Sequence, residues 1–276
     1  MKDKYTYKTL ILEIVVLLIA LMYLAPFYFI ISNSFKPFKD ILLDAASWPV
    51  NFTVNNYTKA WEIINFPIAF KNSIIITVLT DIGIVIISSM TAYRLVRVPS
   101  KFNNFIFGLF VAAMVIPFQS IMIPLVRMVG ALGITNTRLG LIICYFGFGI
   151  SLPVFLYHGF MKSIPKSIEE AAIVDGCSSY GVFFRIVLPL LKPMTATIII
   201  LNTLWIWNDF LLPSLMLQDE ALRTIPLAMN SFFAKYTKKW DLALAGLVMS
   251  VTPVIVFFLS LQKHIINGIV AGSVKG

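Results

Sequence analysis

The segment EEAAIVDG, residues 169–176, is the most informative stretch of this chain because it is acidic and rich in small residues, yet lies between long apolar segments. The segment IVLP, residues 186–189, follows it after a short interval. Ser167 stands three residues before Glu170, the spacing of a capping box, so we expect a short helix to begin there. Gly176 is placed to end this helix in a left-handed turn.

A second short helix is expected directly after this turn. Ser178 or Ser179 is suited to cap it, and Pro189 and Pro193 mark a bend into the next apolar segment. In the first helix, Ala171 and Asp175 share a face, as do Ala172 and Gly176, because they stand four residues apart. Their small side chains would let another protein approach the backbone closely. The alternative is an ordinary amphipathic helix that lies in the membrane interface.

The rest of the chain is too apolar for a water-soluble protein. Hydrophobic residues make up 59% of the sequence and charged residues only 13%, which leaves too little polar surface to cover a soluble protein of this size. A helix needs about 20 apolar residues to cross a bilayer. We predict six membrane spans, at residues 9–32, 72–93, 104–126, 139–160, 194–213 and 243–262. The expected fold is all-α and polytopic, with a single transmembrane domain over residues 1–276.

The distribution of basic residues predicts the orientation. Arg94, Arg97 and Lys101 lie together in one short loop between two spans, and such clusters favour the cytoplasmic side. An even number of spans leaves both termini on the same side, so we expect both in the cytoplasm, together with the loop 161–193 and the tail 263–276. The net charge of +9 is scattered over many loops instead of forming one stripe, which argues against nucleic-acid binding.

The acidic loop resembles the cytoplasmic motif of permease subunits in bacterial ATP-binding-cassette (ABC) importers. That motif, E-A-A-x-x-x-G followed by I-x-L-P, is complete here in Glu170, Ala171, Ala172, Gly176, Ile186, Leu188 and Pro189. The similarity extends to residues 92–97, 116–119, 132–137 and 207–210, and to the tail from residue 262 onward. These features are typical of carbohydrate-type permeases, such as the smaller permease of the maltose importer. The resemblance implies the type I importer permease fold, in the bacterial cytoplasmic membrane.

The resemblance also implies a division of labour among subunits. A second homologous permease would complete the translocation path, two ABC ATPase subunits would hydrolyse ATP with Mg, and an extracellular or periplasmic sugar-binding protein would deliver the substrate, in part through the outer loop 214–242. The acidic loop would be the helix that couples transport to the ATPase. Its expected coupling residues are Glu169, Glu170, Ala171, Ala172, Asp175, Gly176, Ile186, Leu188 and Pro189. The tail residues Ser273, Val274, Lys275 and Gly276 would contact the ATPase subunits.

No catalytic chemistry is expected on this chain. The nucleotide-binding pattern G-x-x-x-x-G-K-[ST] does not occur in the sequence. His158 and His264 have no cysteine or carboxylate companions at metal-ligand spacing, so we expect no metal site and no bound cofactor. A membrane-embedded enzyme is the alternative. It is remote, because such an enzyme needs a nucleophile paired with a base inside the membrane, and the sequence shows no such pair.

Polar residues inside the predicted spans are candidates for the translocation path. Asp81 lies near the centre of the second span, where an ionisable group is unfavourable unless it faces protein or water. It would contact substrate or make a structural hydrogen bond to an adjacent helix. The fifth span combines hydrogen-bonding and aromatic groups, as sugar binding requires, although an aromatic belt is the simpler explanation. Gln119, between Pro117 and Pro124, marks either a kinked helix or the path. The candidates are Asp81, Gln119, Asn202, Trp205, Asn208 and Asp209.

The predicted function is therefore that of a membrane permease subunit in an ATP-driven sugar or oligosaccharide importer, in contact with lipid. A permease for a polyol or for glycerol phosphate is the alternative. Arg and Lys are scarce inside the predicted spans, which favours a neutral sugar over a phosphorylated solute.

Overall fold

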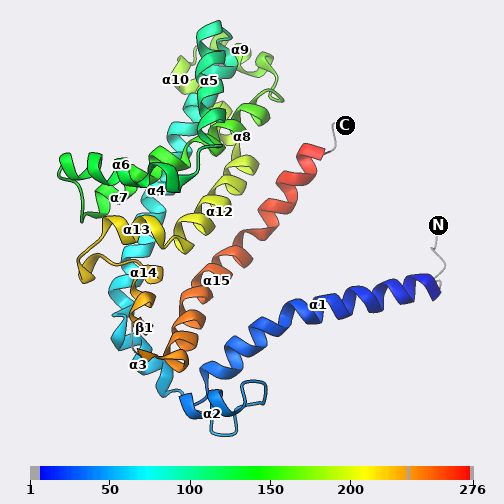
Figure 1. Ribbon diagram of the computed structural model, residues 1–276. Helices are drawn as coiled ribbons and strands as arrows, with labels where there is room; N and C mark the ends of the chain where they lie inside the picture. Colours follow the sequence, from blue (N-terminus) through cyan, green and yellow to red (C-terminus); the bar gives the residue numbers. More distant parts are fainter. Residues whose placement is uncertain (1–6, 235–236, 274–276) are drawn as a thin grey trace. The chain divides into compact units, whose positions relative to one another are not determined.

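The computed structural model describes residues 7–234 and 237–273, with side chains outside 234–238 and 261–273, and this part of the chain is mostly helical (Figure 1). The prediction of a helical protein is thereby confirmed. The strands within the described residues are β1 (Phe233–Ala234) and β2 (Thr237–Lys238), which form a short antiparallel pair.

Three described helices are individually long and apolar enough to cross a membrane: α1 (Tyr7–Ser34), α4 (Phe66–Arg97) and the first part of α15 (Trp240–Ser273). Three helix pairs pass the same test only when they are taken together, because each is bent at a short break. They are α5 (Lys101–Ala113) with α6 (Phe118–Ala131), bent by 104°, α7 (Arg138–Gly149) with α8 (Ser151–Met161), bent by 47°, and residues 179–190 with α12 (Lys192–Asn208), bent by 73°. The described residues thus hold three candidate spans, or up to six if each bent pair is one span.

The predicted span 104–126 is divided between two helices, with the break at the first of the two prolines that flank Gln119. The helix α5 ends at Ala113, and α6 begins only after Pro117, whose backbone is extended at ψ 135°. Proline has no N–H to donate to the preceding turn and restricts the residue before it, so a helix breaks at this point. Pro124 lies inside α6 and does not end it.

The helices at the last two predicted spans do not end where the predicted spans end. The span 194–213 is interrupted because α12 ends at Asn208 and Asp209 is extended, after which α13 (Leu211–Met216) begins. The helix α15 continues past residue 262 to Ser273, and the part of it that is apolar enough to cross a membrane, Trp240–Ser260, overlaps the predicted span 243–262. Val274, Lys275 and Gly276 of the predicted tail lie outside the described residues.

The chain divides into two compact units, residues 1–66 with 229–252 and residues 67–228 with 253–276. In the first unit, α2 (Phe38–Leu43) and α3 (Asn55–Ile63) follow α1. Lys36 is fully buried there, and its Nζ donates to the carbonyl of Asp44 at 3.0 Å. The carboxylate of Asp44 accepts the backbone N–H groups of Ala46 and Ser47, which lowers its pKa. Hydrogen bonds from side chains to the backbone therefore order this loop.

The second unit is built along α4. The buried face of this helix carries small and polar side chains, among them Asn72, Ser73, Thr77, Asp81 and Ser88. One core cluster surrounds Tyr145 and Ile206, and another surrounds Tyr157 and Leu191. In this unit α8 packs against both α5 and α12, and α7 packs against α13 (Figure 1). These contacts hold the breaks of the bent helices in place.

Candidate functional site

A cavity of about 590 Å³ lies where three helical segments of the second unit break. Its walls come from the α5–α6 break, from the α7–α8 junction, and from the end of α12 with the start of α13. The volume is in the range of small-molecule sites. The polar or aromatic residues that line it are Gln119, Ser151, Phe118, Phe148, Trp205 and Asp209.

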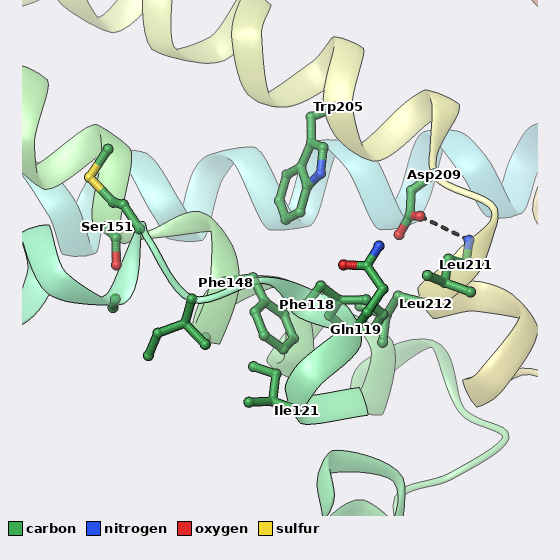
Figure 2. A pocket seen from close by; sticks show the side chains of 13 residues that line it. Phe118, Gln119, Ile121, Phe148, Ser151, Trp205, Asp209, Leu211 and Leu212 are labelled. Carbon is green, nitrogen blue, oxygen red and sulfur yellow. Dashed lines mark hydrogen bonds between the residues drawn. The ribbon is translucent and has the colours of Figure 1, made fainter. Parts of the chain in front are cut away.

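Asp209 is held in position by two hydrogen bonds. The hydroxyl of Tyr145 donates to its Oδ2 at 2.9 Å. The backbone N–H of Leu211 donates to its Oδ1 at 3.0 Å (Figure 2). The ring of Trp205 packs edge-on against Tyr145, with the centroids 5.4 Å apart. Figure 2 shows the side chains of Gln119, Trp205 and Asp209 directed toward the same region. An amide, an indole and a carboxylate therefore converge on one hollow.

The structure brings together three of the six residues that we expected in the translocation path. Asp81 does not line this cavity, because it is buried against α12, where Thr203 Oγ1 donates to its Oδ2 at 2.6 Å. This contact corresponds to the structural alternative that the sequence left open. Asn202 is also buried, and Asn208 donates to the carbonyl of Leu204 in its own helix.

The sequence reasoning missed Ser151, Phe148 and the supporting role of Tyr145. Tyr145 lies 64 residues from Asp209 in the chain, and no local pattern relates two residues so far apart. Ser151 occurs at the α7–α8 junction, where the bend itself could not be seen from hydropathy.

The acidic loop forms a second candidate site, and its first helix is α9 (Lys166–Val174). The expected capping box at Ser167 is wrong. Pro165 is the residue before the helix, and no side chain caps its start. The reason is that Pro165 is extended and already ends the preceding segment, so Ser167 lies inside the helix and not at its start.

The end of α9 confirms the prediction for Gly176. Its φ is +86°, in the left-handed region. The N–H of Cys177 donates to the carbonyl of Ala172 at 2.9 Å, and that of Gly176 donates to Ile173 at 3.0 Å. This pair of bonds is a Schellman motif, which satisfies carbonyls that the helix end leaves free.

The second helical run of the loop begins as expected. Ser178 Oγ accepts the N–H of Gly181 at 3.2 Å and caps α10 (Ser179–Gly181). The run continues through a π-helix (Val182–Val187) and α11 (Leu188–Leu190). It then bends by 73° into α12 at Leu191, between the two prolines that were predicted to mark the bend.

The small residues of α9 do not form the one exposed surface that the sequence led us to expect. Ala172 is buried in the core cluster around Tyr157, so it packs within its own chain. Ile186 and Leu188 pack against the same cluster. The exposed side of α9 holds Glu170, Ala171, Ile173, Val174 and Asp175.

Glu169 was expected among the residues that couple to the ATPase, but the structure turns its side chain inward. Its carboxylate bonds to Arg97 and Tyr93 of α4. Only Glu170 and Asp175 thus present carboxylates on the exposed face. The charge that this loop offers to a partner is smaller than the sequence indicated.

Known proteins resemble the chain along nearly all of its length. Residues 83–270 match the family described as binding-protein-dependent transport system inner membrane component. The chain is 45% identical over 259 residues to the probable starch degradation products transport system permease protein AmyC of Thermoanaerobacterium thermosulfurigenes, covering 94% of each chain. It is 37% identical over 279 residues to the melibiose/raffinose/stachyose import permease protein MelC of Bacillus subtilis, covering 100% of each chain.

A solved structure has the same fold. It belongs to a bacterial ABC transporter involved in the import of the acidic polysaccharide alginate. Its TM-score is 0.79 at 24% identity, and the match covers 95% of this chain and 99% of that chain.

The chain has the fold of that importer chain, and its described helices include several that are long and apolar enough to cross a membrane, alone or as bent pairs. The chain belongs to the family of binding-protein-dependent transport system inner membrane components, which confirms the resemblance read from the loop motif. This family is a transport component, and membership implies that the chain works with other transporter subunits and a binding protein.

Proposed function

We propose that this chain is a permease subunit that imports a sugar or an oligosaccharide. Partner subunits would bind ATP with Mg and hydrolyse the ATP. The support for the sugar class is that AmyC is named for starch degradation products and MelC for melibiose, raffinose and stachyose. In this proposal the chain acts as one permease domain with six spans in the bacterial cytoplasmic membrane. Both termini lie in the cytoplasm, and the chain itself binds no cofactor.

The observation that carries the coupling proposal is the exposed face of α9 in the second unit. Ile173 is 56% exposed and Val174 is 87% exposed, beside the carboxylates of Glu170 and Asp175. An apolar pair with flanking charges, presented on a helix that ends in a defined turn, suits docking on another protein. We propose that two ATPase subunits serve the importer and that one of them receives this face. Residues 273–276 would lie between the ATPase subunits.

We propose that the cavity is the part of the translocation path that this chain contributes. A second homologous permease would contribute the rest of the path. Trp205 offers a flat apolar ring, while Gln119 and Asp209 offer hydrogen-bonding groups, the combination that a sugar ring matches with its apolar face and its hydroxyls. The described lining contains an aspartate and no basic residue. A neutral solute is therefore favoured over glycerol phosphate, whose charge Asp209 would repel.

Affinity purification of this chain from its native membrane tests the proposal. We expect mass spectrometry to identify an ATPase subunit and a second permease. We also expect raffinose or maltotriose, presented with the binding protein, to stimulate ATP hydrolysis, while glycerol 3-phosphate does not. A chain that purifies alone and shows no sugar-stimulated hydrolysis would overturn the proposal.

A further inference from the structure

A buried ion pair joins the end of α4 to the first turns of α9. Arg97 Nε donates to Glu169 Oε1 at 2.7 Å, and its Nη2 lies 2.5 Å from the same oxygen. The hydroxyl of Tyr93 donates to Glu169 Oε2 at 2.9 Å. The side chains of Arg97 and Glu169 are only 10% and 9% exposed. Both carboxylate oxygens of Glu169 are therefore bonded to α4.

Arg97 also holds the segment that leads into α9. Its Nη2 donates to the carbonyl of Ile164 at 3.0 Å, directly before Pro165. The helix α9 has nine residues, which is too short to be stable without tertiary contacts. Ala172, its buried apolar residue, is small and covers little surface. The contacts of Arg97 and Tyr93 thus fix both the first turns of α9 and the segment that leads into it.

The opposite end of α4 is held in a similar manner. Asn72 Nδ2 donates to the carbonyls of Ala221 and Arg223 at 2.9 and 3.0 Å, and its Oδ1 accepts Arg138 Nε at 2.8 Å. Ser73 Oγ accepts the N–H of Ile225 at 2.9 Å. All these residues belong to the second unit. A helix of 32 residues, roughly 48 Å long, therefore connects the loop 219–225 with the loop that carries α9.

We propose that Arg97, supported by Tyr93, is a positioning residue for coupling, and that it makes α9 move together with α4. The inference rests on the proposed docking of α9 on an ATPase subunit. A displacement of α9 then reaches α4 through the buried ion pair. Because α4 also holds the loop 219–225 at its opposite end, the same displacement reaches that loop. Arg97 itself touches neither the solute nor ATP.

The test uses the complete importer with its ATPase subunits, reconstituted in liposomes with the binding protein. The variants are Arg97→Gln, Glu169→Gln, Arg97→Lys and the double variant Arg97→Glu with Glu169→Arg. Arg94→Gln is the matched control, since Arg94 is exposed and lies one turn earlier in α4. Uptake of labelled raffinose or maltotriose, whichever the wild type transports, is compared with ATP hydrolysis in the same sample. Hydrogen exchange of residues 164–176 reports the attachment of α9 directly.

We expect each single glutamine variant to lower the uptake per ATP hydrolysed about tenfold, because one partner of a buried ion pair is removed. Hydrogen exchange of α9 should rise in the same variants, whereas the ATPase subunits should still copurify. Arg97→Lys should give an intermediate loss, because lysine cannot make the forked contact. In the double variant with reversed charges, the uptake per ATP hydrolysed should be at least about threefold higher than in either single glutamine variant. Arg94→Gln should behave as wild type.

The inference fails if the glutamine variants keep the wild-type ratio of uptake to hydrolysis, or if they lose the ratio while exchange of α9 is unchanged. It also fails if Arg94→Gln is as damaging as Arg97→Gln. Glu170→Lys separates these outcomes from a failure of the proposed docking, because Glu170 is exposed on the docking face. If Glu170→Lys leaves subunit association and uptake normal, the docking proposal is wrong. If Glu170→Lys impairs them and Arg97→Gln does not, only the positioning inference is wrong.

Discussion

Gly176 provides the sharpest test of the coupling loop, because its conformation can be changed without altering any contact. Its φ of +86° places it in the region that L-residues with a side chain adopt reluctantly. A Cβ built on it would meet no heavy atom within 4 Å. Within this chain, replacement by alanine therefore changes the backbone preference of the turn and no side-chain contact. Replacement by proline additionally removes the N–H that donates to Ile173 at 3.0 Å.

The expected magnitude follows from these two effects. Alanine in a left-handed conformation costs about 1 to 2 kcal/mol, which corresponds to roughly a five- to thirtyfold fall in the population of the native turn. Asparagine tolerates this region better and should cost less. Proline cannot reach a positive φ at all, so the Schellman turn would be lost. The order of impairment should be proline, then alanine, then asparagine, then glycine.

ATP-driven uptake and ATP hydrolysis by the reconstituted importer measure this series. We expect uptake to fall in the stated order while the proline variant retains hydrolysis that is no longer stimulated by sugar. Gly159→Ala is the control, because that glycine lies inside α8 and has no heavy atom near its potential Cβ.

The reasoning would be refuted by an alanine variant as impaired as the proline variant, or by an asparagine variant worse than alanine. Normal coupled uptake in Gly176→Pro would show that the turn does not matter for coupling. In that case the docking role of α9 would have to be abandoned.

Three further predictions concern the path and the packing of the second unit. Thr203→Val should lower the free energy of unfolding in detergent by about 1 to 2 kcal/mol, because Asp81 loses its donor at 2.6 Å. Gly140→Ala should destabilise by about 1 to 3 kcal/mol, since the new Cβ would lie 2.0 Å from the backbone oxygen of Ile134. Trp205→Ala should raise the apparent KM for sugar uptake about tenfold, because an aromatic contact of roughly 1 to 1.5 kcal/mol is lost.

Each of these predictions has a control or a contrary result. Thr203→Ser keeps the hydroxyl and should remain close to wild type in thermal unfolding. A Gly140→Ala protein as stable as the Gly159→Ala control would show that the chain near Ile134 yields without strain. Trp205→Phe should retain most of the sugar affinity. If Trp205→Ala leaves KM unchanged, the cavity is not part of the path.

The features of the fold that the sequence predicted are those determined by neighbouring residues. The apolar segments were located because a bilayer requires long runs of apolar side chains, and the turn at Gly176 was located because glycine tolerates a positive φ. The helix start at Ser178 is similarly local. The breaks at Pro117 and Asp209 were underestimated, since hydropathy is insensitive to a bend inside an apolar run.

The candidate sites were predicted less completely. Gln119, Trp205 and Asp209 were grouped as candidates and do line one cavity, but Asp81 and Asn202 were grouped with them on polarity alone. A polar residue inside a span faces either a cavity or another helix. Hydropathy cannot distinguish the two, because both environments relieve the penalty of the hydrocarbon.

The sequence by itself determined the class of the molecule, a helical membrane permease whose loop motif marks its family. Only the tertiary structure decided which side chains act together. Glu169 pairs with Arg97, which is 72 residues away in the chain, and Asp81 accepts a hydrogen bond from Thr203, which is 122 residues away. Turn and span preferences depend on short-range sterics and on hydropathy, both of which are visible in the sequence. The pairing of distant charges depends on how the bent helices pack, which no local rule contains.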